Sequence, residues 1–118
     1  MWDVKEKMWA NKVIVTVKSV KGKCPAGLKV GDKVVLIGDN IEEGNDKVCL
    51  LGMYAIWPLI NTMVWAGKIP PDSPFYVDKD TVVASCPDSK NLVVFEMRKV
   101  GACERRPDTK GKYVPKED

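Results

Sequence analysis

The chain has 118 residues, of which 45% are hydrophobic and 30% charged, and its net charge is +3. This composition is typical of one globular domain, which is too small to enclose a deep cleft between subdomains. The sequence contains no histidine, which excludes Ser-His-Asp catalysis, Cys-His catalysis and every histidine-containing metal site. Basic and acidic residues are interleaved and the isoelectric point is near 8.6, so nucleic acid is not an expected partner.

The N-terminal segment Met1–Lys7 has no long apolar run and no small-residue cleavage site. We therefore expect a cytoplasmic protein whose thiols are reduced. The segment Val48–Gly67 is uncharged and nominally long enough to cross a bilayer. Because Pro58 and Asn61 lie near its middle, the sequence favours a buried core helix and no membrane span.

The first regular element is predicted at Lys12–Val20, after an N-terminal arm at residues 1–11. Val13, Val15 and Val17 alternate with polar residues, the pattern of a half-buried strand. The second strand is predicted at Lys33–Ile37, directly after a tight turn at Gly31.

The polar segment Asp39–Asp46 is expected to form a surface loop. A helix is predicted from Cys49 to about Ala66, bent or interrupted at Pro58. Its apolar residues occur nearly all round, the pattern of a helix enclosed on most sides. Gly67 is the expected C-cap.

Two more strands are predicted, at Thr81–Ser85 and Leu92–Arg98, with a turn between them. Residues 101–118 are polar and are expected to form a C-terminal tail. The prediction is thus a single α+β domain at residues 12–100, a small antiparallel sheet of β-β-α-β-β order packed on one central apolar helix.

Two aspartates, Asp32 and Asp88, directly follow Gly31 and Pro87 in predicted turns. Aspartate at such positions usually accepts hydrogen bonds from nearby backbone N–H groups. We therefore expect both carboxylates to stabilise turns rather than to catalyse a reaction.

The cysteines Cys24, Cys49 and Cys86 lie at predicted element boundaries. Three thiolates converging from separate loops would form an open zinc site or hold an iron–sulfur cluster, with Cys103 or an external group as the fourth ligand. No Cys-x-x-Cys pair supports this hypothesis. The alternative is that the cysteines are small hydrophobic residues of the core.

Cys49 is the best candidate for a catalytic or redox-active thiol. At the first turn of a helix, the backbone N–H groups and the helix dipole lower the pKa of a thiol. If Cys49 faces the core instead, burial raises its pKa and the residue is inert. The sequence leaves both alternatives open.

Aromatic residues occur in two places. Those of the helix, Tyr54, Trp57 and Trp65, are predicted to belong to the core or to an interface. Trp2 and Trp9 lie on the N-terminal arm, where exposure of their large apolar rings to water is costly. We therefore predict that these two residues form an interface, either with the domain or with another chain.

The order and spacing of several short motifs resemble a family of small, uncharacterised prokaryotic proteins that is frequent in anaerobic bacteria and archaea. The matching motifs lie within residues 12–100: Cys24-x-x-Gly27, Val30-Gly31-Asp32, the apolar helix opened by Cys49 and containing Trp57-Pro58, the Gly67…Pro70 exit, and Cys86-Pro87-Asp88 followed by Val93-Val94-Phe95-Glu96. The resemblance implies no particular activity. The shared cysteines are Cys24, Cys49 and Cys86, whereas Cys103 lies outside the pattern. The family more often has Cys-Pro at the helix start, where this chain has Cys49-Leu50.

The leading functional hypothesis is a non-catalytic small subunit or binding module, such as a subunit of a larger enzyme complex. Its size, its lack of histidine and its tryptophan-bearing arm point to a protein partner or a homo-oligomer. The two alternatives are a thiolate metal protein that binds zinc or an iron–sulfur cluster through Cys24, Cys49 and Cys86, and a reactive-thiol protein centred on Cys49.

Overall fold

Two long strands, β1 (Met8–Val20) and β6 (Val93–Arg105), form the centre of the sheet and pair antiparallel along most of their lengths. The computed structural model describes residues 8–38, 40–44, 49–65, 69–70, 72–110 and 112–116. β-Branched residues dominate the middle of β1, where the alternating side chains of Val13, Val15 and Val17 are buried.

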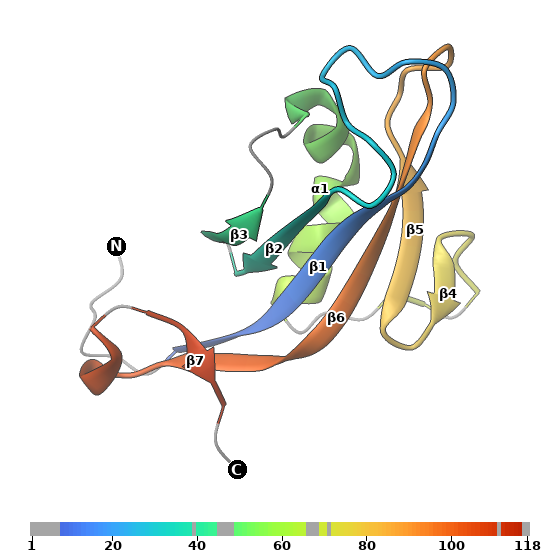
Figure 1. The fold of residues 1–118 in the computed structure, drawn as a ribbon. Coiled ribbons are helices and arrows are strands. Elements are labelled where there is room, and N and C mark those ends of the chain that lie inside the picture. The colour runs from blue at the N-terminus through green and yellow to red at the C-terminus, as the bar shows by residue number, and fades with distance from the viewer. Residues whose placement is uncertain are drawn as a thin grey trace.

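The remaining strands extend the sheet on both sides of this central pair (Figure 1). The order is β3-β2-β1-β6-β5-β4, all neighbours are antiparallel, and β7 pairs with the end of β6. The bounds are β2 (Lys33–Ile37), β3 (Asn40–Gly44), β4 (Tyr76–Asp78), β5 (Thr81–Ser85) and β7 (Val114–Pro115).

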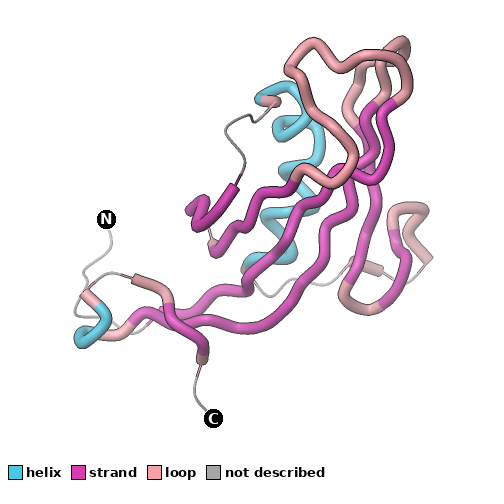
Figure 2. Tube along the Cα trace, in the orientation of Figure 1, coloured by secondary structure: helices cyan, strands magenta, loops and turns pink. Residues whose placement is uncertain are grey.

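One helix, α1 (Leu50–Val64), packs on a single face of this sheet (Figure 2). Its residues Ile56, Ile60 and Val64 are completely buried. They share one core with inward-facing residues of four strands: Val13, Val15, Val17, Val34, Leu36, Val82, Phe95 and Met97. Among the described residues, no helix combines the length and the hydropathy needed to cross a membrane.

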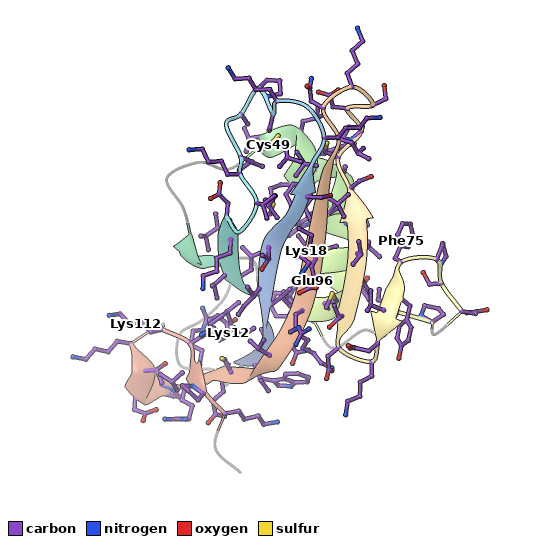
Figure 3. All side chains as sticks on the ribbon, turned by 45° about the vertical axis from the view of Figure 1, so that its right-hand side comes forward. Lys12, Lys18, Cys49, Phe75, Glu96 and Lys112 are labelled. Carbon is purple, nitrogen blue, oxygen red and sulfur yellow. The ribbon has the colours of Figure 1, made fainter. Side chains whose placement is uncertain are left out.

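The opposite face of the central strands carries charged side chains. Lys18 of β1 and Glu96 of β6 form an ion pair of 3.7 Å there (Figure 3). Such partly exposed pairs contribute little to stability but keep this face of the sheet compatible with water.

The α+β class and the antiparallel sheet with one helix are confirmed, but the predicted β-β-α-β-β order is wrong. Three strands precede α1, because β3 occupies part of the segment expected to be a loop. The strands β4 and β7 were also not expected. These three strands are short and are held mainly by backbone pairing. They therefore lack the pattern of buried side chains from which strands are predicted in a sequence.

Both central strands run beyond their predicted bounds. β1 begins at Met8, inside the segment expected as an arm, and β6 continues to Arg105, inside the expected tail. A 3₁₀-helix at Pro107–Thr109 follows. Arg106 binds the carboxylates of Glu104 and Asp108, and this guanidinium lowers the pKa of Asp108.

The two turn aspartates act as predicted. The carboxylate of Asp32 accepts the backbone N–H of Lys29 at 2.9 Å. That of Asp88 accepts the backbone N–H groups of Asn91 and Lys90 at 3.1 and 3.0 Å, and these hydrogen bonds lower the pKa of Asp88.

The C-terminal end of α1 is tied to the sheet by one buried side chain. Asn11 of β1 donates a hydrogen bond of 2.8 Å from Nδ2 to the carbonyl of Met63. This carbonyl belongs to the last turn, where no helix N–H is available to bind it. Asn11 therefore satisfies a backbone acceptor in the last turn of the helix.

We predict that Asn11→Ala lowers the free energy of unfolding by about 1–3 kcal/mol, because it leaves the Met63 carbonyl without its donor. Urea denaturation at low protein concentration measures this change. The exposed Asn61→Ala is the matched control and should change the value by less than about 0.5 kcal/mol. Equal effects of the two substitutions would contradict the assigned role of Asn11.

Candidate functional site: the outer face of the helix

The sequence of α1 contains no charged residue, yet the sheet covers only one of its sides. On the other side, Leu50 is 81% exposed, Leu51 56% and Tyr54 82%. The described part of the chain therefore does not enclose the helix on most sides, in contrast to the prediction. A helix that is apolar all round normally has protein or lipid on every side.

The exposed side chains form a continuous row, which we call the outer face. It comprises Leu50, Leu51, Tyr54, Ala55, Pro58 and Asn61. Their spacing of three and four residues places them on one side of the helix. A shallow hollow of about 570 Å³ runs along the first half of this row and is also lined by Met53 and Trp57.

Pro58 lies in the middle of the outer face, and α1 continues through it to Val64. Proline has no N–H, so the carbonyl of Tyr54 loses its helical partner. Pro58 is exposed, so the missing N–H lies outside the buried side of the helix. Thr62 donates a hydrogen bond of 2.9 Å to the Pro58 carbonyl from the following turn.

Cys49, predicted to lie in the first turn of the helix, is its N-cap, directly before Leu50. Its sulfur accepts a hydrogen bond of 3.4 Å from the backbone N–H of Gly52, and the residue is half-buried (Figure 3). A Cβ at Gly52 would lie 3.0 Å from the ring of Phe95. The glycine therefore allows the first turn of the helix to lie close against β6.

The other cysteines are buried. Cys24 and Cys86 belong to the same core cluster against which Cys49 packs. Cys86 also has a structural role, because its sulfur accepts the backbone N–H of Val93 at 3.3 Å beside the β5–β6 turn. Cys103 lies in a separate cluster with Ala10 and Ile37.

No cluster of three His, Cys, Asp or Glu side chains that could hold a metal ion occurs in the part of the chain that the structure describes. The hypothesis of a zinc or iron–sulfur site at Cys24, Cys49 and Cys86 therefore rests on the sequence pattern alone.

Of the two tryptophans predicted to form an interface, Trp2 lies outside the described residues. Trp9 is part of β1 and is 43% exposed. The ammonium of Lys116 lies 5.1 Å from its ring centroid, a cation–π contact that joins the two ends of the chain.

A second cavity, of about 560 Å³, lies between the end of α1 and the β4–β5 hairpin. Its lining combines the apolar side chains of Met63 and Val82 with four charged residues: Asp78, Lys79, Asp80 and Lys99. Asp80 is engaged in an ion pair with Lys99 at 3.6 Å.

Comparison with known proteins finds no matching family model, no matching curated protein and no matching solved structure. The functional argument therefore depends on the residues of this chain alone.

The exposure of Leu50, Leu51 and Tyr54 was not predicted. The sequence did carry a signal, because an uncharged helix needs cover on all sides and one small sheet can supply it on only one. The sequence alone does not show which of these residues are left exposed, because that depends on which side of the helix packs on the sheet.

We predict that iodoacetamide alkylates Cys49 of the native protein more than about tenfold faster than Cys24, Cys86 or Cys103, because the buried thiols react only after local opening. Mass spectrometry of peptides after timed quenching measures the four rates. The unfolded protein in urea is the control, where the four rates should converge. Native rates that are equal at all four cysteines would contradict the described burial.

Proposed function

We propose that this protein is a non-catalytic binding module, a small subunit that joins another protein chain through the outer face of α1. The observation that supports the proposal is the row of exposed apolar side chains on a helix without a single charge. Exposed apolar patches of this kind usually mark an interaction site.

Burial of this row on a partner would be strongly favourable. Full burial of one leucine contributes about 1.5–3 kcal/mol, and Leu50 and Leu51 are both largely exposed in the isolated chain. Tyr54 adds a rigid aromatic ring with a polar hydroxyl, a residue type enriched in the centres of interfaces. The adjoining hollow would receive an apolar side chain of the partner.

A reactive thiol at Cys49 is the second candidate function. It is supported by the position of the half-buried sulfur at the helix N-terminus, next to the outer face. A partner bound on Leu50 and Leu51 would also cover this thiol. The substitution Cys49→Ser distinguishes the two functions. It removes the thiol but should leave binding of a protein partner intact.

The proposed interface is tested by placing the photo-cross-linking residue p-benzoylphenylalanine at position 54 in cells of the source organism. We expect one dominant cross-linked species, because Tyr54 lies in the middle of the exposed row. The same probe at Lys112, an exposed residue distant from α1, is the control and should not yield it (Figure 3).

The captured chain should then bind the purified protein in a fixed ratio. Leu51→Asp should abolish this binding, since it buries a charge without a partner. Val100→Asp, at an apolar residue of β6 that is 47% exposed, should not affect it. A probe at position 54 that captures no protein would refute the proposal.

A further inference from the structure

The cavity of about 560 Å³ at the end of α1 shares no lining residue with the hollow on the outer face. The β4–β5 hairpin forms one of its sides and lies at the edge of the sheet remote from β2 and β3 (Figure 1). A volume of about 300–1,000 Å³ is typical of pockets that bind small molecules. The cavity is therefore large enough to hold such a ligand.

One part of the cavity lining is apolar. Its residues come from the helix, the segment after it and the hairpin: Met63, Ile69, Pro70, Tyr76 and Val82. Met63 and Val82 also belong to the core, and Ile69 packs against it. An apolar group that replaces water on such a surface binds favourably. This part of the lining therefore suits a ligand with a sizeable apolar group.

The other part of the lining is charged, and its charges balance. It contains two carboxylates and two ammonium groups: Asp78, Lys79, Asp80 and Lys99. Asp80 and Lys99 form an ion pair of 3.6 Å with each other. A ligand with a single charge would be attracted by one group of the lining and repelled by its neighbour. The balance therefore favours a ligand that carries both charges, as a zwitterion does.

Asp78 and Lys79 remain available to such a ligand. Asp78 is the last residue of β4, Lys79 follows it, and both are exposed. Neither forms an ion pair within 4.0 Å among the described residues. The backbone N–H of Asp80 donates a hydrogen bond of 2.9 Å to Asp78 and lowers the pKa of Asp78, and Arg98 lowers it further. Asp78 is thus ionised at neutral pH.

We propose that this cavity binds a free amino acid with a large apolar side chain. The ammonium and the carboxylate of an α-amino acid are bonded to the same carbon, so two neighbouring groups of opposite charge match them. In this arrangement Asp78 accepts hydrogen bonds from the ligand's ammonium, and Lys79 donates to its carboxylate. The apolar side chain of the ligand lies against Met63 and Val82.

The expected affinity is low. Asp78 and Lys79 are exposed to water, where each contact between opposite charges contributes little. Most of the binding free energy must then come from the apolar side chain of the ligand. We therefore expect a dissociation constant in the millimolar range.

Titration of the isotopically labelled full chain with L-phenylalanine, followed by NMR of the backbone amides, tests the inference. We expect saturable shifts at Val82 and Lys99 and none at Leu51 or Tyr54 on the outer face. Phenethylamine lacks the carboxylate and hydrocinnamate lacks the ammonium, so each should bind at least about fivefold more weakly. Glycine, which lacks the apolar side chain, should cause no shift.

Two substitutions test the assigned contacts. Lys79→Met and Asp78→Asn each remove one charge, and the amide that Asp78→Asn introduces still accepts the backbone N–H of Asp80, so the turn is retained. Each should weaken binding of L-phenylalanine about fivefold. Lys112→Met removes the same charge as Lys79→Met at an exposed residue on the other side of the molecule and should leave binding unchanged (Figure 3).

The inference is overturned if L-phenylalanine causes no shift up to its solubility limit, or if phenethylamine or hydrocinnamate binds as tightly. Unchanged binding by Lys79→Met and Asp78→Asn would equally contradict it. The outcome is independent of the proposed function, because the outer face takes no part. A chain that binds L-phenylalanine but no protein would retain this inference and lose that function, and the reverse result would retain the function alone.

Discussion

A single sheet can cover only one side of a helix, and the structure depends on this constraint. The buried side of α1 fills the space over β1, β5 and β6 with Ile56, Ile60 and Val64. Asn11 and Gly52 then fix the helix at its two ends, one by a hydrogen bond to Met63 and the other by close packing on Phe95. The orientation that buries these residues leaves Leu50, Leu51 and Tyr54 in water.

The charged groups follow from the same arrangement. The long β1–β2 loop packs against the start of α1, so its lysines gather at that end of the helix. The β4–β5 hairpin adjoins the last turn of α1 and brings Asp78, Lys79 and Asp80 there, beside Lys99 of β6. Neither cluster is a sequence motif. Both arise because antiparallel connections return the chain to fixed ends of the sheet.

Much of this fold could be predicted from particular residues. The alternating valines of β1 and the uncharged segment after Cys49 indicated the central strand and the helix, and Asp32 and Asp88 indicated their turns. The strands β3 and β4 could not be predicted, since backbone pairing at an edge leaves little trace in side-chain polarity. The outer face could not be located either. The sequence shows that a residue is apolar, but it does not show whether the residue is buried by its own chain or by another chain.

The central claim is that the outer face of α1 is covered by another protein chain, and native mass spectrometry of the protein isolated from its own cells tests it most directly. The account predicts a complex of fixed stoichiometry with a second chain, because Leu50, Leu51 and Tyr54 are exposed in the isolated chain. The Leu51→Asp variant should be recovered without that second chain. Recovery of the unaltered protein as a single free chain, or of the same complex with Leu51→Asp, would contradict the account.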